Sequence, residues 1–187
     1  MGLITINNKN DLIQGKRIFL RAPELADVDI LYKWENDTSL WRVSNTIAPF
    51  SRFAIEQYLI NAGSDIYAAR QLRLMICLLD QDNTPIGAID LFDFDPHHSR
   101  AGIGIVIIDE FRNQGYAKES LIVLIDYCFD HLGIHQLYSN ISEDNSSSIR
   151  LFENVGFINT GRKLAWIKHG STWKDELIFQ KINITFN

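Results

Sequence analysis

One run of the chain constrains its fold more than any other: a β-branched apolar segment at 101–108 leads through a polar turn into an amphipathic pattern. After the turn at 109–117, apolar residues recur at the helical spacing i, i+3, i+4, i+7, i+8 and i+11. They are Leu121, Leu124, Ile125, Cys128, Phe129 and Leu132. This spacing predicts a helix with one buried face, ended by Gly133. A strand joined to such a helix is typical of a sheet covered by helices, so the sequence predicts an α/β (α+β) fold.

The remaining segments add strands and helices on both sides of this unit. Alternating or continuously apolar patterns predict strands at 17–21, 72–79, 86–92, 135–142, 158–168 and 172–182. Helical patterns run from 23 to 34, from 51 to 61 and onward from Asn145, which is a good N-cap residue. A chain of 187 residues has the length of one ordinary globular domain. We therefore expect a single domain over 1–187, with its core at about 17–181.

The overall composition excludes several classes of protein. The net charge of −5 argues against nucleic acid as a partner, because neutralising phosphates requires a basic face. No apolar run reaches the roughly 18 residues of a membrane span, and the first residues lack the features of a signal peptide. We therefore expect a cytoplasmic protein with no membrane partner. Cys77 and Cys128 lie in apolar runs, which indicates core residues, and no metal site is expected because no set of ligands has suitable spacing.

Charge is distributed unevenly along the chain. The stretch 80–95 contains five aspartates and no lysine or arginine, whereas 162–181 has a local charge of +3 because five basic residues outweigh two acidic ones. Charge runs often form ordinary solvated faces. If the acidic stretch instead lines a site, it suits a cationic ligand.

The turn before the amphipathic helix has the properties of a phosphate-binding site. A helix N-terminus carries unsatisfied N–H groups and the positive end of the helix dipole. Gly115 permits close approach of a ligand, Ala117 adds almost no bulk, and Arg112 and Lys118 add positive charge. A plain connection between a strand and a helix also favours glycine, so this turn needs a second motif to carry an assignment.

A second motif follows downstream, and the two motifs together, in this order, resemble those of the GNAT N-acetyltransferases. Arg112-x-x-Gly115-x-Ala117 is similar to the family's acyl-CoA pyrophosphate signature, R/Q-x-x-G-x-G/A. The later segment Asn145-x-x-Ser148-Ile149-x-Leu151-Phe152-Glu153-x-x-Gly156-Phe157 is similar to the family's N-x-x-[SA]-[IV]-x-L-Y-E-x-x-G-F. Residues 19–22 and 34–37 most resemble the branch that contains RimJ/RimL and spermidine N-acetyltransferases.

The resemblance implies a mixed, mostly antiparallel, V-shaped sheet flanked by helices. Its strands 101–108 and 136–142 would splay apart to admit acetyl-CoA. The residues implied to bind this cosubstrate are Val106, Ile107, Arg112, Gln114, Gly115, Tyr116, Ala117 and Asn145. Those at 114–117 would offer backbone N–H groups to the pyrophosphate, 106 and 107 would pair with the pantetheine arm, and Asn145 would bond the pantetheine or the acceptor side.

One departure from the family pattern concerns catalysis. Family members transfer the acetyl group directly to an amine, which requires a deprotonated nucleophile and a proton for the departing thiolate. Phe152 stands where many relatives have a tyrosine proposed to supply that proton. Ser148, Tyr138 and Tyr116 are the alternative hydroxyl groups, and spacing alone favours none of them.

The acceptor side departs from the pattern as well. Gly102 stands about where similar polyamine acetyltransferases have glutamate, which leaves Asp90 and Asp93 as the carboxylates expected to approach the acceptor. We prefer Asp90, also as a catalytic residue. Residues three positions apart face opposite sides of a regular strand unless a bulge intervenes. Glu35 is a further residue that could attract a cationic acceptor.

These observations leave three hypotheses for function. The first is acetyl-CoA-dependent transfer to a primary amine, either a polyamine such as spermidine or another small cationic amine. The second is acetylation of a protein or peptide N-terminus, as in RimL-like enzymes. The third, prompted by Phe152, is an acyl-CoA-binding protein without catalysis. The expected partners are acetyl-CoA and an amine. GNAT relatives are often dimers, so the resemblance leaves a homodimer as one possible oligomeric state.

Overall fold

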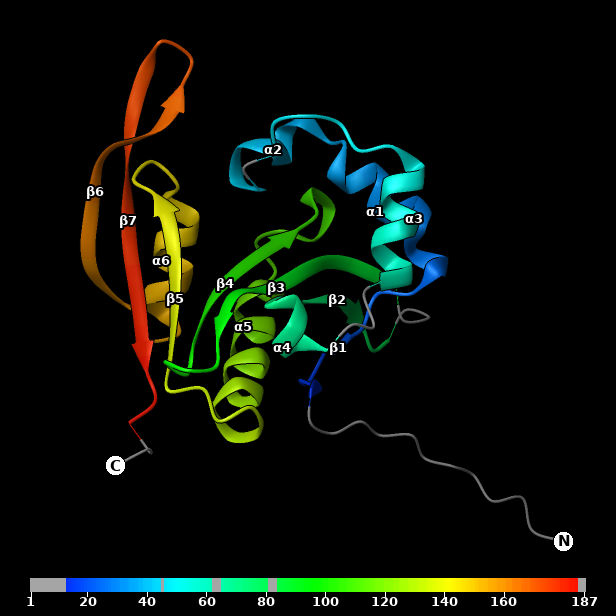
Figure 1. Cartoon of the computed structure of the whole chain (residues 1–187), viewed down its shortest axis with the longest axis horizontal. Coiled ribbons are helices and arrows are strands. Elements are labelled where there is room, and N and C mark those ends of the chain that lie inside the picture. Colours follow the sequence, from blue (N-terminus) through cyan, green and yellow to red (C-terminus); the bar gives the residue numbers. More distant parts are fainter. Residues whose placement is uncertain (1–12, 45, 62–64, 81–83, 185–187) are drawn as a thin grey trace, which may run out of the picture.

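Seven strands form a single sheet with helices on its faces, in a computed structural model that describes residues 13–44, 46–61, 65–80 and 84–184 (Figure 1). The strands are β1 (Ile18–Arg21), β2 (Leu72–Leu78), β3 (Pro85–Asp95), β4 (Arg100–Ile107), β5 (Gln136–Ser142), β6 (Ile158–His169) and β7 (Thr172–Ile182). The helices are α1 (Val28–Glu35), α2 (Thr38–Ser44), α3 (Arg52–Asn61), α4 (Ile66–Ala69), α5 (Tyr116–Asp126) and α6 (Ser146–Asn154). Shorter turns are η2 (Leu25–Asp27), η3 (Asp109–Phe111) and the π-helical η4 (Tyr127–His131).

The sheet is open at one internal position. Its strand order is β1-β2-β3-β4-β5-β7-β6, and all neighbours run antiparallel except β4 and β5, which are parallel. Those two strands pair only between 100–102 and 136–138. Beyond this short contact they separate, and Figure 1 shows them meeting at one end and diverging toward the other. The predicted V-shaped, mostly antiparallel sheet is confirmed.

The N-terminal half of the sheet is covered on both faces, which explains the continuous apolar run in β2. Met75 and Cys77 pack in one cluster with α1 and α3, whereas Leu74 and Ile76 belong to a larger cluster that includes the apolar face of α5. Alternate residues of a strand point to opposite faces, so a strand covered on both sides must be apolar throughout. Cys77 and Cys128 are buried in these clusters without a disulfide, as predicted.

The structure differs from the predicted elements in a few places. The amphipathic run does not continue as one regular helix to Leu132, because its last turn is π-helical. The predicted helix at 23–34 is divided into η2 and α1. The resemblance to the family implies a helical segment around Trp41, but the local pattern does not predict helix α2, since its sequence is rich in serine, threonine and valine, which are weak helix formers. Tertiary contacts hold it: Leu40 is buried, and the Trp41 indole N–H donates to the Glu35 carbonyl at 2.8 Å. No helix in the described part of the chain is long and apolar enough to cross a membrane.

Candidate active site

A cavity of about 660 Å³ lies where β4 and β5 diverge. Residues Gly104 to Val106 of β4 line one side of it, and residues Ser139 to Ser142 of β5 line the other. Further lining residues come from α1, α2 and α6, and from β6 and β7. The volume lies within the range of about 300–1,000 Å³ that is usual for sites that bind small molecules.

Within the described residues, the edge of β4 that faces this cavity pairs with no strand beyond Gly102. Backbone N–H and C=O groups along such an edge can pair with an extended ligand that carries amide groups. Val106 lines the cavity, as its predicted role requires. Ile107 is buried outside the lining, and its carbonyl oxygen already accepts a hydrogen bond from Arg112 Nε at 2.8 Å.

Residues 112–117 form the turn that begins α5, and they do not line the cavity. Gly115 is the N-cap and has a φ of 85°, a left-handed conformation that favours glycine. Arg112 is held by two contacts, to the Ile107 carbonyl and to Asp109 at 2.6 Å. Arg112 therefore shapes the turn. Gly115 allows the chain to enter α5 in a conformation that leaves the first N–H groups of the helix without a side-chain cap at its N-terminus.

Arg17, which the sequence analysis did not single out, fixes the same turn from the start of β1. Its guanidinium lies 4.6 Å from the centroid of the Tyr116 ring, forms an ion pair with Glu119 at 2.9 Å and donates to the Gln114 carbonyl at 3.0 Å. Although burial opposes it, hydrogen bonds from Arg17 hold the pKa of Glu119 below its usual range. No local signal predicts these contacts, because they join segments about 100 residues apart.

Helix α6 presents three predicted residues to the cavity: Asn145, Ser148 and Phe152. Asn145 caps the helix, since its Oδ1 accepts from the Ser148 backbone N–H at 3.2 Å and from the Ser147 hydroxyl at 2.9 Å. Phe152 is almost fully buried and packs edge-on against Phe157. Ser148 thus lines the cavity one helical turn before Phe152, which occupies the family's tyrosine position.

Glu35 and Asp90 lie on the opposite wall of the cavity, on either side of a cation that the sequence analysis missed. Arg73 contacts Asp90 through Nε at 2.7 Å and Nη2 at 3.2 Å, and it contacts Glu35 through Nη1 at 2.5 Å. The aromatic ring of Tyr58 lies 5.7 Å from the guanidinium carbon. Burial opposes the charge, yet Asp90 and Glu35 raise the pKa of Arg73 above its usual range, so it remains a cation. We refer to Glu35, Arg73 and Asp90 as the acceptor-wall cluster.

Asp93 and Tyr138 are not brought together with Asp90. The pairing of β3 with β4 shifts between Phe92 and Asp95, and Asp93 within this bulge has a φ of 49°. The Tyr138 hydroxyl donates to Asp93 at 3.1 Å, and both residues line a separate depression of about 460 Å³. Burial and the Asp93 carboxylate raise the pKa of Tyr138 to about 12.

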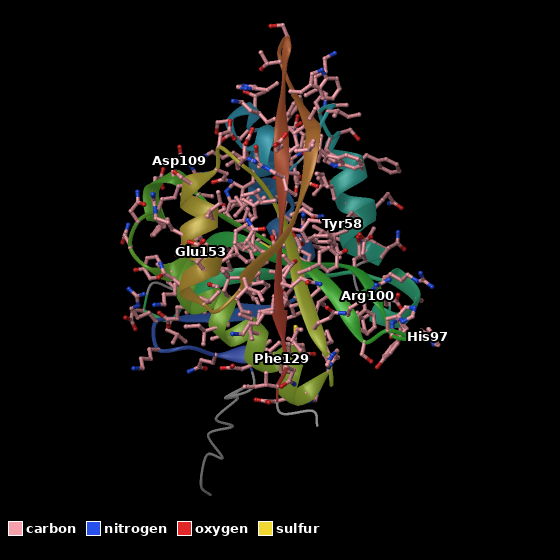
Figure 2. All side chains as sticks on the ribbon, turned by 90° about the vertical axis from the view of Figure 1, so that its left-hand side faces the viewer. Tyr58, His97, Arg100, Asp109, Phe129 and Glu153 are labelled. Atoms are coloured by element: carbon pink, nitrogen blue, oxygen red, sulfur yellow. The ribbon has the colours of Figure 1, made fainter. Side chains whose placement is uncertain are left out.

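The predicted acidic stretch is therefore not one surface. Asp90 is paired with Arg73 in the cavity, and Asp95 is paired with Arg100 at 3.2 Å beside the separate depression. Asp82 lies outside the described residues. In Figure 2, Tyr58 and Arg100 lie to the right of β7 and Asp109 and Glu153 lie to its left.

Two further carboxylates line the cavity. Asp144 follows β5, and Glu176 comes from β7, where it is buried and paired with Lys163 at 2.7 Å. Among the described lining residues the charged ones are thus Glu35, Asp90, Asp144, Glu176 and Arg73, four acids and one base. In the described part of the chain, His, Cys, Asp and Glu form no group of three or more that could hold a metal ion.

A sheet that splays beside a glycine turn at a helix N-terminus is the arrangement that the resemblance to the N-acetyltransferases implies. Residues 17–158 match the family described as Acetyltransferase (GNAT) domain, and the chain belongs to this family of N-acetyltransferases, which use acetyl-CoA.

Two curated relatives and one solved structure illustrate the similarity. The chain is 26% identical over 151 residues to the uncharacterized N-acetyltransferase p20 of Bacillus licheniformis, covering 81% of this chain and 84% of that protein. It is 24% identical over 150 residues to the spermidine N(1)-acetyltransferase of Vibrio cholerae, covering 79% and 82%. The fold matches the crystal structure of the Vibrio cholerae spermidine N-acetyltransferase in complex with CoA and spermine, with a TM-score of 0.79, 21% identity and coverage of 89% and 95%.

Proposed function

We propose that this protein transfers the acetyl group of acetyl-CoA directly to a primary amine on a small cationic acceptor, such as a polyamine. The observation that carries the proposal is the lining of the cavity between β4 and β5, where the described residues supply four carboxylates and one arginine. Lys163 pairs with Glu176 from outside the lining, so these groups together leave an excess of two negative charges. A cavity with this excess of negative charge attracts ammonium groups and disfavours anionic acceptors. The similarity to an enzyme named spermidine N(1)-acetyltransferase supports the same substrate class.

The residues around the opening fit acetyl-CoA in three places. The free edge of β4 beside Val106, including the N–H group of Ile107, can pair with the amide groups of a pantetheine arm, while the Ile107 carbonyl is held by Arg112. The left-handed Gly115 leaves the N–H groups of 114–117 at the start of α5, where a pyrophosphate is stabilised by the helix dipole. Arg112 holds this turn in shape, and Asn145 lies beside the opening at the start of α6. When bound, acetyl-CoA supplies the thioester that the amine attacks.

We assign Ser148 as the group that gives the departing thiolate its proton. The nitrogen of the attacking amine loses a proton as the amide forms, and that proton restores the Ser148 hydroxyl. This hydroxyl lines the cavity on the same helix as Phe152, whose ring carries no exchangeable proton. A thiol of this kind has a pKa of roughly 8.5, so its thiolate leaves readily and a weak donor is sufficient.

We assign Asp90 and Glu35 to binding the acceptor. Both oxygens of Asp90 already accept hydrogen bonds from Arg73, which leaves this carboxylate better suited to orient an ammonium group than to remove its proton. Asp93 and Tyr138 line the separate depression and receive no role in the transfer itself.

The test is turnover of acetyl-CoA, followed by thiol release, over spermidine, spermine, diamines, aminoglycosides and short peptides. Turnover of the cationic amines supports the proposal. Turnover of only a peptide with neutral side chains would instead identify an N-terminal acetyltransferase, and calorimetric CoA binding without any turnover would identify an acyl-CoA-binding protein. Asp90→Asn should raise KM for the amine about tenfold, whereas the matched control Asp95→Asn, on the same strand but outside the cavity, should not.

Two further expectations need other measurements. Sedimentation would test whether the protein forms a homodimer, and cell fractionation would test whether it is cytoplasmic.

A further inference from the structure

The acceptor-wall cluster joins three elements at the cavity surface. Glu35 is the last residue of α1, Arg73 lies near the start of β2, and Asp90 is its direct partner on β3. All three line the cavity, and the arginine side chain retains 26% of its exposure. A cation in contact with both acids in this way gives the wall a net charge of −1 instead of −2.

We infer that Arg73 determines the selectivity of this site among amines of different charge, an inference that rests on the proposed function. By neutralising one of two carboxylates, Arg73 matches the wall to a single ammonium group of the acceptor, distinct from the deprotonated amine that reacts. It also holds both acids in fixed positions, because its planar guanidinium binds Asp90 with two N–H groups and Glu35 with a third.

The charge of the wall has an effect that grows with the charge of the acceptor. Coulomb energy is proportional to the product of the charges, so an additional negative charge favours a trication more than a monocation. Removing Arg73 should therefore improve the relative use of spermidine over butylamine. A loss of folded protein lowers the rate with both amines equally and leaves their ratio unchanged, so this ratio separates selectivity from stability.

The chain offers a matched control for the loss of an arginine ion pair. Arg21 on β1 binds Asp27 through two contacts of 2.7 Å, and its side chain is 27% exposed, close to the value for Arg73. Arg21 does not line the cavity. Arg21→Met therefore removes a similar pair without changing the charge of the acceptor wall.

The experiment measures kcat/KM for butylamine, cadaverine and spermidine at low ionic strength with the wild-type chain, Arg73→Met, Arg73→Lys and Arg21→Met. In Arg73→Met we expect the ratio for spermidine over butylamine to rise about fivefold or more, and to fall back as salt is added. In Arg73→Lys, which keeps the charge, and in Arg21→Met the ratio should stay within about twofold of the wild-type value. An unchanged ratio in Arg73→Met would overturn the inference while leaving the proposed function intact.

Equilibrium dialysis of the same amines against the CoA-bound protein gives a readout that does not depend on catalysis. If no amine is turned over but the ratio of dissociation constants shifts in Arg73→Met, the proposed function is wrong and the selectivity role stands. If the wild-type protein binds none of the three amines, both proposals are wrong.

Discussion

The rings of Phe152 and Phe157 pack edge to face, with their centroids 5.0 Å apart and their planes at 80°. This contact fixes the phenylalanine at the position where many relatives have tyrosine, and it keeps the ring at the cavity wall. A tyrosine in the same rotamer would retain the packing and add a hydroxyl group to the ring, which makes the position a direct probe of proton donation.

Replacing Ser148 with alanine should lower kcat about tenfold, because the departing thiolate loses the donor assigned to it on α6. The KM for acetyl-CoA should change little. Adding Phe152→Tyr to this variant should restore most of the rate, since the new hydroxyl replaces the lost donor. Steady-state kinetics of thiol release measure all three quantities. Ser146→Ala, at an exposed position in the same helix, is the control. Full activity of Ser148→Ala would rule out the assigned role.

Replacing Gly115 with alanine should weaken acetyl-CoA binding. Left-handed backbone costs an L-residue about 1–2 kcal/mol, and the new Cβ would lie 3.3 Å from Arg17 Nη2. Gly170 also has a positive φ, 61°, but has no atom within 4 Å of the Cβ position. Both alanine variants should lose about 1 kcal/mol of unfolding free energy in urea titrations. Only Gly115→Ala should raise KM for acetyl-CoA, and an equal rise in Gly170→Ala would contradict the role of the turn.

The ion pair between Arg21 and Asp27 should make the free energy of unfolding depend on pH. Although burial opposes it, hydrogen bonds from Arg21 and from the Glu24 backbone N–H lower the pKa of Asp27. The folded state then holds a proton on Asp27 less tightly than the unfolded state, so the contribution is present above the unfolded pKa of about 3.9 and is lost as pH falls through the folded value.

Asp27→Asn should therefore reduce the free energy of unfolding by about 3 kcal/mol at pH 7, because it leaves a partly buried arginine without its partner. The difference from the wild-type chain should shrink as the pH falls below about 4. Urea titrations at a series of pH values measure it. A difference that stays constant down to pH 2 would show that the ion pair makes no contribution.

In an alkaline titration, the phenol of Tyr138 should lose its proton at a higher pH than an ordinary tyrosine. Burial, together with Asp93, raises the pKa of this phenol to about 12. The ultraviolet absorbance of tyrosinate should lose its step near pH 12 in Tyr138→Phe, and Asp93→Asn should move that step to lower pH. Since Tyr138 lies outside the cavity between β4 and β5, kcat at neutral pH should stay within about twofold. A large loss of kcat would restore the catalytic role expected from sequence.

Much of the scaffold was predictable because its signals are local. Helix α5 follows from the spacing of its apolar residues, α6 from the N-cap at Asn145, and the turn between β4 and α5 from Gly115. Each of these depends on residues within a few positions of one another. The local pattern does not predict helix α2, because the burial of Leu40 and the hydrogen bond from Trp41 to Glu35 stabilise it, and not the helix propensity of its residues.

The sequence by itself determined the strands, most of the helices, the glycine turn and the family, since periodicity, caps and motifs are read along the chain. The tertiary structure alone decided the charge of the site. Arg73 neutralises part of a wall built from Glu35 and Asp90, while Asp93 turns away in a bulge to meet Tyr138. Electrostatic energy depends on distances between side chains, and folding sets those distances between residues that are far apart in sequence.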